Sequence, residues 1–194
     1  ISVITYQPKG DYQQWNPIET LLATALTRAL PDQLSAGVTT PHNAQRSQVQ
    51  SALVDAHARQ TGKTITADEL EQAVETVNRF QGGENDVMVV SATVADPQYI
   101  SRESDLLLSQ SRLNVSLTRH KQKLIVLVPQ ALIGYIPPEG DQYDNVQNWK
   151  LLAQASGEAP VGTDATPTES GTVGDLAGNK LATCGWIDEA ESTL

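Results

Sequence analysis

The chain has 194 residues and a formal net charge of −10 at pH 7, from 13 basic and 23 acidic residues. This length suits one α/β domain followed by a tail, and a domain of this size buries a core without disulfide bonds. The single cysteine, Cys184, has no internal partner, which favours a reducing, cytoplasmic compartment. No apolar run approaches the roughly 20 residues of a membrane-spanning helix, so we expect no membrane partner.

The acidic charge is distributed unevenly along the chain. Residues 151–194 contain seven acids and one lysine, whereas residues 102–123 contain five cations and two acids. Nucleic-acid binding is dominated by cation–phosphate contacts, so the overall charge argues against it, although the local basic strip can still meet a phosphate. The excess of acids suits a soluble protein, or one adapted to high salt as in a halophilic archaeon.

Strand-like and helix-like patterns alternate along the first 155 residues. In chain order they predict a strand at 2–6, a loop at 11–15, a helix at 17–30, a strand at 36–40, a helix at 44–59, a loop at 60–66, a short helix at 68–72, a brief strand at 74–77, a buried strand at 86–93, a loop at 96–104, a helix at 105–121, a buried strand at 124–129 and a helix at 145–155.

This alternation predicts an α/β fold in which helices cover both faces of a parallel sheet. Ligands of such sheets lie at the carboxyl ends of the strands, a rule that brings residues just after Thr40 together with those around the strand at 86–91. Residues 1–156 are then one domain. Residues 157–194, which are rich in Gly, Thr, Ser and acids, form an acidic linker or tail.

Gly62-Lys63-Thr64 has the look of the end of a phosphate-binding P-loop. The full pattern needs a glycine five residues earlier, where this chain has His57, and it needs a strand before the loop rather than a helix. We therefore expect a solvated loop. The three histidines are scattered and Cys184 stands apart, so the sequence predicts no metal site.

Two polar blocks, residues 79–84 and 114–121, lead into the apolar runs at 87–90 and 124–128, which we interpret as buried strands. The first block ends in Glu84. The second contains Arg119, which has no acidic partner near it in the sequence. A fixed polar or cationic group beside a buried strand is suited to holding a mobile, highly charged ligand such as a nucleoside triphosphate. The charge of Arg119 is expected to face a group outside its own segment.

Three segments stand in the order and spacing of the C-terminal motifs of superfamily 1 helicases. They are Gly37-Val38-Thr39-Thr40-Pro41-His42-Asn43-Ala44-Gln45, Val77-Asn78-Arg79-Phe80-Gln81-Gly82-Gly83-Glu84-Asn85-Asp86 and Arg112-Leu113-Asn114-Val115-Ser116-Leu117-Thr118-Arg119-His120. The chain resembles the AAA-type branch that includes the nonsense-mediated decay helicase and its DNA-replication relatives. Asn16-Pro17-Ile18-Glu19 also resembles the opening of the first helix of this half, and the resemblance covers residues 1–130.

The resemblance implies a second RecA-like domain, without its own P-loop, that closes over ATP bound to a first one. Arg119 would be the arginine finger on the γ-phosphate, and Gln81 would couple nucleotide to nucleic acid. Gly82 and Gly83 would let the backbone approach the phosphates, and Glu84 would bond the ribose or place the finger.

One helical face is expected to carry Arg112, Ser116 and Arg119, at i, i+4 and i+7, with Lys123 continuing the line if the helix runs on. Arg112 would then line the nucleotide cleft. An ordinary solvated face explains Arg112 and Lys123 equally well. Leu113 and Leu117 lie on another face, which is suited to packing on the sheet.

The nucleic-acid side would be formed by Thr40, Pro41, His42 and Thr76. His42 replaces the usual tyrosine, and its ring could stack on a base; a capping or core histidine is the alternative. The chain also departs from the family pattern at Asn78, where aspartate is usual, and at His120, where alanine is usual.

These observations predict the C-terminal motor half of an ATP-dependent helicase or translocase. Its partners would be single-stranded DNA or RNA and an N-terminal RecA-like domain, which would supply the P-loop and the Mg²⁺ ligands. The fragment alone is therefore expected to be inactive. The alternative is a non-catalytic RecA-like module that binds nucleic acid or protein.

Overall fold

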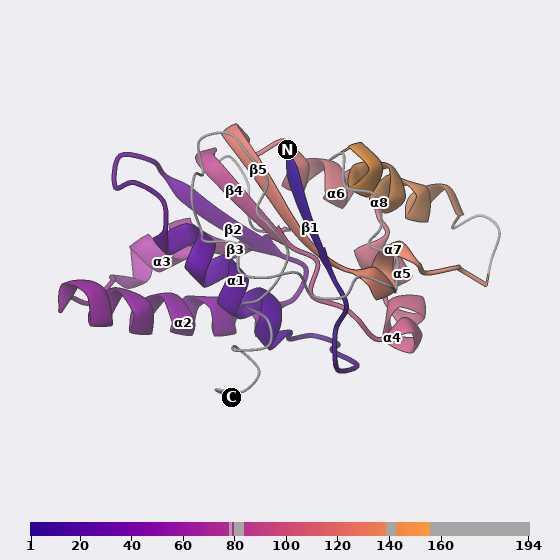
Figure 1. The fold of residues 1–194 in the computed structure, drawn as a ribbon, viewed down its shortest axis with the longest axis horizontal. Coiled ribbons are helices and arrows are strands. Elements are labelled where there is room, and N and C mark those ends of the chain that lie inside the picture. Colours follow the sequence, from indigo (N-terminus) through magenta and orange to yellow (C-terminus); the bar gives the residue numbers. More distant parts are fainter. Residues whose placement is uncertain (78, 80–83, 139–142, 156–194) are drawn as a thin grey trace, which may run out of the picture. The chain divides into compact units, whose positions relative to one another are not determined.

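A five-stranded parallel sheet forms the centre of the molecule, in the order β1-β5-β4-β2-β3 (Figure 1). This computed structural model describes residues 1–77, 79, 84–138 and 143–155. The strands are β1 (Ser2–Tyr6), β2 (Ala36–Thr40), β3 (Val74–Thr76), β4 (Asn85–Ser91) and β5 (His120–Pro129). The helices are α1 (Pro17–Arg28), α2 (Asn43–Thr61), α3 (Ala67–Ala73), α4 (Pro97–Arg102), α5 (Ser104–Leu107), α6 (Gln110–Leu117), α7 (Gln130–Ile133) and α8 (Tyr143–Ala155).

Helices cover both faces of the sheet. In β4, Val87 and Val89 face a hydrophobic cluster completed by α1, α2 and α3, whereas Met88 and Val90 face a second cluster completed by α4 to α8. Successive residues of a strand point to opposite faces, so a strand buried on both sides needs a continuous apolar run. This arrangement confirms the predicted fold class and explains why residues 87–90 are uniformly apolar.

The predicted start of the first helix is also confirmed. The side chain of Asn16 accepts hydrogen bonds from the backbone N–H groups of Ile18, at 3.1 Å, and Glu19, at 3.4 Å, and Pro17 occupies the first helical position. Among the described residues, none of the helices is both long and apolar enough to cross a membrane.

Two predictions for residues 96–121 are wrong. The expected loop at 96–104 contains α4, whose N-cap is Asp96: its carboxylate accepts hydrogen bonds from the backbone of Gln98, at 2.8 Å, and Tyr99, at 3.3 Å. Asp96 followed by Pro97 is the same kind of helix-start signal as Asn16 followed by Pro17, so the sequence does contain a signal for α4.

The single helix expected at 105–121 is instead two short helices and the start of β5. Helix α5 ends at Leu107 and α6 begins at Gln110, and both Leu107 and Leu108 are buried where the two helices separate. At the other end, His120 pairs with Asn85 in the sheet, so residues 120–123 extend β5. The short helix α7 was not predicted, and the strand expected to end at Thr93 ends at Ser91. The remaining predicted elements agree within two residues.

Parallel strands give the sheet two different edges. Residues that precede a strand gather at the amino edge, and residues that follow one gather at the carboxyl edge. Glu84 and Arg119 directly precede β4 and β5, whereas Pro41 and His42 directly follow β2. The two predicted groups of site residues therefore lie at opposite edges.

Asp86 ties three strands together at the amino edge. Its Oδ2 accepts hydrogen bonds from the backbone N–H of Ser35, at 2.9 Å, and from the Ser35 hydroxyl, at 2.8 Å, just before β2 begins. Its Oδ1 accepts a hydrogen bond from Gln122 of β5 at 3.1 Å. The bonds from the Ser35 backbone and hydroxyl lower the pKa of the Asp86 carboxyl below its ordinary value.

We expect Asp86→Asn to lower the thermal unfolding midpoint at pH 7, because the variant loses the charged acceptor of these bonds. A carboxyl whose pKa is lower in the folded state stabilises the fold at pH values above 3.8, its ordinary pKa. This stabilisation is lost as pH falls through the lowered folded-state pKa. The difference from the unsubstituted chain should therefore shrink in acid. Calorimetry at several pH values measures this. Asp55→Asn, at an exposed position of α2, is the matched control. A difference that persists undiminished in acid contradicts the assignment.

Candidate functional site

Arg119 and Glu84 are brought together at the amino edge by backbone pairing. The N–H of Asn85, the residue after Glu84, donates to the carbonyl of Arg119 at 3.1 Å. Asn85 is also the sheet partner of His120, the residue after Arg119. The two motifs that the sequence places 35 positions apart are thus adjacent in space, on the ends of two central strands.

The guanidinium of Arg119 is held close to the protein without an acidic partner. Its side chain is half-buried, and its Nε is buried with no hydrogen-bond partner in the described part of the chain. No ion pair joins Arg119 to any described carboxylate, Glu84 included, whose side chain is exposed. Leaving a buried N–H donor of a permanent cation without an acceptor costs free energy, and an anionic ligand could supply that acceptor.

The turn before β5 fixes the backbone of Arg119. Helix α6 ends at Leu117, and the hydroxyl of Thr118 donates back to the carbonyl of Asn114 at 2.9 Å. Nδ1 of His120 lies 2.8 Å from the carbonyl of Leu117, as expected for a protonated ring nitrogen capping the helix end. His120, a departure from the family pattern, therefore has a local structural role.

The expected helical face of Arg112, Ser116, Arg119 and Lys123 does not exist. Only Arg112 and Ser116 belong to α6, because the helix ends before Arg119 and Lys123 lies in β5. Ser116 is buried, and its hydroxyl donates to the carbonyl of Arg112 at 3.1 Å rather than facing a cleft. The packing half of the prediction is confirmed, since Leu113 is buried in the core and Leu117 packs against it. The role given to Arg112 stays a prediction.

Gln81, Gly82 and Gly83 lie outside the described residues, so their predicted roles are untested. Their flanks are described: Thr76 ends β3 at the carboxyl edge, and Glu84 precedes β4 at the amino edge.

The predicted nucleic-acid residues are grouped at the carboxyl edge. Thr40 and Thr76 are sheet partners, and both are buried. The hydroxyl of Thr40 is engaged in a local turn, since it donates to the carbonyl of His42 at 2.9 Å and accepts from the N–H of His42 at 3.2 Å. Pro41 is half-buried. The grouping agrees with the prediction, and the roles themselves stay predictions.

His42 packs as a core residue at this edge. Its ring is 8% exposed and makes an edge-to-face contact with Tyr99 of α4, with ring centroids 5.8 Å apart. It makes no capping hydrogen bond at the start of α2, and its Nε2 is buried without a partner among the described residues. Burial lowers the pKa of His42, so the neutral ring is favoured. Little of the ring is free to stack on a base.

A buried hydrogen-bond network, which the sequence did not reveal, underlies the carboxyl edge. The fully buried carboxyl of Glu19 accepts hydrogen bonds from the hydroxyl of Tyr6 at 2.6 Å, from the backbone N–H of Thr93 at 2.8 Å, and from the hydroxyl of Ser91. The side-chain amide of Asn16 donates to the carbonyl of Thr93 at 2.9 Å and to the oxygen of Tyr6 at 2.6 Å. These bonds join three segments of the chain: the end of β1, the start of α1 and the end of β4 with the turn that follows it.

Thr93 is the strained element of this network. Its φ is 68°, in the left-handed region that residues with a Cβ seldom adopt, and it is fully buried. Glu19 holds its N–H and Asn16 holds its carbonyl, so the turn after β4 is fixed from both sides. The sequence pattern predicts only that Glu19 belongs to the start of a helix. A glutamate that follows Asn-Pro at the third helical position gives no sequence signal for burial.

Gln45 carries the network to the start of α2. Its Nε2 donates to the hydroxyl of Ser91 at 3.2 Å, and its Oε1 accepts from the backbone N–H of Asn16 at 2.9 Å. Gln45 is fully buried and follows His42 by three residues. This glutamine of the first motif therefore anchors α2 against β4 and α1.

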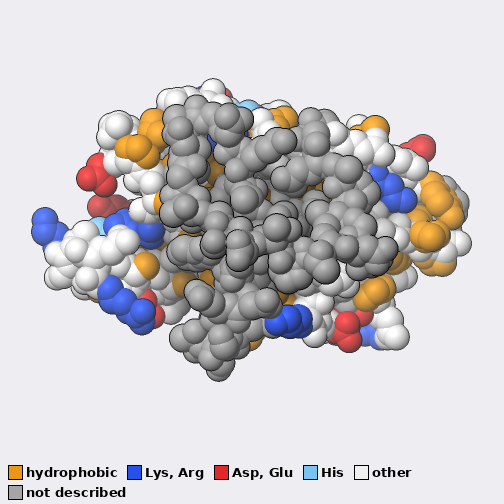
Figure 2. Space-filling model, viewed as in Figure 1, with side chains coloured by type: hydrophobic (Ala, Val, Ile, Leu, Met, Phe, Trp, Pro, Cys, Tyr) orange, Lys and Arg blue, Asp and Glu red, His pale blue; other side chains and the backbone are white. Residues whose placement is uncertain are grey.

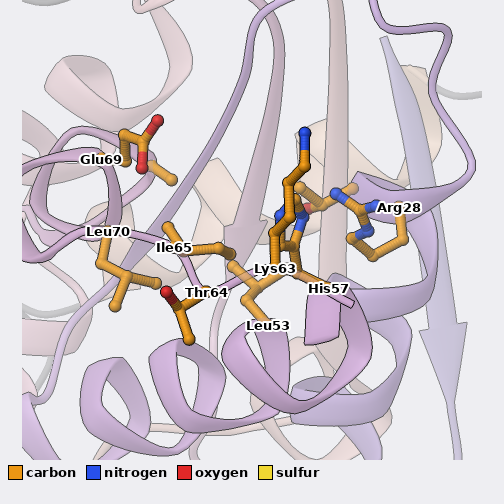
Figure 3. Close-up of a pocket in the computed structure, with 10 residues that line it drawn as sticks. Arg28, Leu53, His57, Lys63, Thr64, Ile65, Glu69 and Leu70 are labelled. Carbon is orange, nitrogen blue, oxygen red and sulfur yellow. The ribbon is translucent and has the colours of Figure 1, made fainter. Parts of the chain in front are cut away.

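The Gly62-Lys63-Thr64 segment is an exposed loop, as predicted. Helix α2 runs directly into it and ends on Gly62, which has a left-handed φ of 68°, so the strand that a P-loop needs is absent there. The loop borders a cavity of about 360 Å³ between α1, α2 and α3 (Figure 3). Arg28, His57 and Lys63 stand together on one side of it, with Leu70 and Glu69 on the other.

Charged side chains of both signs are visible on the face drawn in Figure 2. In the view of Figure 2, basic side chains occur in small groups at the rim, with acidic ones among them. Among the described residues, there is no group of three or more His, Cys, Asp or Glu that could hold a metal ion.

Residues 11–130 match a protein-family model described as an AAA domain. Over 126 residues, or 63% of this chain, the sequence is 29% identical to the DNA replication ATP-dependent helicase/nuclease JHS1 of Arabidopsis thaliana. The chain spans about 8% of the length of that relative. The matched range contains every site residue predicted from the sequence, and both matches agree with the resemblance to a helicase-type domain.

We expect the stability of the domain to depend on the protonation of Glu19. Burial raises the pKa of its carboxyl to about 7, against the three hydrogen bonds, which lower it. A raised folded-state pKa means that the fold binds the proton more tightly than the unfolded chain does, so this contribution is full below pH 4.5 and is lost as pH rises to about 7. The loss is about 3 kcal/mol of unfolding free energy.

Glu19→Gln keeps the shape and the neutral charge of the protonated side chain. This variant should therefore lack the fall in unfolding free energy between acid and neutral pH, and urea unfolding at a series of pH values measures it. Glu71→Gln is the control, since that side chain is 66% exposed. A variant curve parallel to that of the unsubstituted chain would show that Glu19 does not titrate in this range.

Proposed function

Because this chain belongs to the AAA domain family and contains a helicase-type domain, we propose that it is the C-terminal motor half of an ATP-dependent nucleic-acid helicase or translocase. In this proposal, the amino edge of the sheet closes over ATP held by an N-terminal RecA-like domain. The carboxyl edge contributes to the grip on a single strand. The Arabidopsis relative is a DNA replication helicase/nuclease, which favours DNA over RNA as that strand.

One observation carries the proposal: Arg119 is fixed at the amino edge beside Glu84, with a buried Nε and no ion-pair partner among the described residues. An arginine that merely improved solubility would be free in solvent, and a structural arginine would be paired. The position of Arg119, between α6 and the central strand β5, keeps its backbone fixed while its charge stays available.

The chemistry of this group suits phosphoryl transfer. The guanidinium stays protonated at any physiological pH and offers several donors in a fixed plane. As the γ-phosphoryl group transfers to water, negative charge develops on its oxygens, and a fixed cation stabilises that charge more than it stabilises bound ATP. Arg119 would supply this charge only when the two motor domains close. Hydrolysis is then linked to domain movement. Magnesium would be held by the N-terminal domain.

The other site residues receive roles that fit their positions. Glu84 is exposed beside Arg119, where its carboxylate can accept a hydrogen bond from the ribose or orient the finger. Gly82 and Gly83 would let the backbone approach the phosphates, Gln81 would couple nucleotide to nucleic acid, and Arg112 would line the nucleotide cleft from α6. The nucleic-acid side, at the carboxyl edge, would be formed by Thr40, Pro41, His42 and Thr76.

We expect Arg119→Ala in the full-length protein to retain ATP binding and to lose turnover by about 10³- to 10⁵-fold, the usual contribution of an arginine finger. Nucleotide affinity and steady-state phosphate release measure the two effects separately. Arg59→Ala, an exposed arginine in the last turn of α2, is the matched control. Unchanged turnover in Arg119→Ala would favour the non-catalytic binding module instead.

Residues 1–194 by themselves should show no ATPase activity, with or without single-stranded DNA, because this sequence contains no complete P-loop. Adding the N-terminal domain as a separate chain should restore turnover, and the restoration should require Arg119. Phosphate release from the purified chain tests this directly. Robust hydrolysis by the chain alone would contradict the division of the site between two domains.

A further inference from the structure

We propose that Trp15 is the base-stacking residue of the carboxyl edge, so that a nucleobase of the bound strand packs against its indole ring. This inference rests on the proposed function and adds a residue that the family motifs do not contain. Its basis is the exposure of Trp15, its fixed orientation, and its connections to the residues around His42.

Trp15 presents a large aromatic surface where His42 does not. Its side chain is 44% exposed, against 8% for His42 and 6% for Trp149. It lies in the loop that follows β1, at the carboxyl edge of the sheet. An aromatic ring stacks on every type of base, so one exposed ring is enough for a contact that does not depend on sequence.

Hydrogen bonds hold the loop around Trp15 to its neighbours. The indole N–H donates to the hydroxyl of Thr20 at 3.2 Å, which sets the direction of the ring. The preceding side chains hold the loop to α4: Gln13 donates to Asp96 at 2.7 Å, and Gln14 donates to the hydroxyl of Tyr99 at 2.8 Å. A ring that is already ordered loses little conformational entropy when a base binds to it.

The same contacts connect Trp15 to the predicted nucleic-acid residues. Tyr99, which Gln14 contacts, is the ring that packs edge-to-face on His42. On the other side of Trp15, the backbone of Asn16 donates to Gln45 in the first turn of α2. These contacts connect Trp15 to the segment after β2, and in our proposal the bound strand passes Pro41 and His42 and meets the exposed ring.

Stacking should contribute differently from phosphate contacts. Contacts to phosphate release counterions and weaken steeply with salt, whereas a stacked ring releases none. The contribution of Trp15 should therefore be nearly the same at low and high salt. It should also require a base, so the affinity for an abasic strand with the same phosphates should not depend on Trp15.

The test uses the full-length protein and a fluorescein-labelled oligo(dT) strand, with an abasic strand of equal length for comparison. We expect Trp15→Ala to weaken oligo(dT) binding about 5- to 150-fold, the range that loss of one stacked base gives. Trp15→Phe should lose much less. Both variants should bind the abasic strand like the unsubstituted protein, and the factor lost on oligo(dT) should not change with salt.

Tyr143→Ala is the matched control, because this aromatic residue is 45% exposed. It lies on α8, which packs on the face of the sheet opposite to α1 and α2. Equal loss in Tyr143→Ala, equal loss on the abasic strand, or full affinity in Trp15→Ala would each overturn the proposal for Trp15. In those cases oligo(dT) binding by the unsubstituted protein would leave the proposed function standing. Failure of the unsubstituted protein to bind any single strand would overturn both.

Discussion

Parallel pairing of β4 with both β2 and β5 is the constraint on which the rest of the structure depends. Because all strands run the same way, the segments that enter them meet at one edge and the segments that leave them meet at the other. Arg119 and Glu84 enter, and His42 leaves. One sheet thus keeps Arg119 and His42 at opposite edges while the paired strands β2, β4 and β5 connect those edges.

Each edge is fixed by one carboxyl group, and the two groups behave in opposite ways. Asp86 keeps partial contact with solvent at the amino edge, and donors from Ser35 lower its pKa, so the charged form holds β2, β4 and β5 together. Glu19 is buried at the carboxyl edge, and loss of solvent raises its pKa despite its donors. Solvation decides the difference, because both carboxyls accept several hydrogen bonds.

How far the sequence could predict the fold depended on whether a signal was local. The apolar run at 87–90 gave a strand buried on both faces, and Asn16 followed by Pro17 gave the start of α1, because each pattern reflects the immediate surroundings of the chain. The helix expected at 105–121 failed for a non-local reason. Pairing of His120 with Asn85 draws the end of that segment into the sheet, and spacing within the segment carries no trace of it.

The site followed the same division. By itself, the sequence determined the fold class, the helicase-type motifs and the identity of the unpaired arginine, since these lie in short runs of residue types with fixed spacing. Only the tertiary structure decided that the Nε of Arg119 is buried without a partner among the described residues, that His42 is packed while Trp15 is exposed, and that Glu19 lies in a buried network with Thr93. Burial, pKa and exposure depend on what distant segments place around a side chain, and that is set by packing.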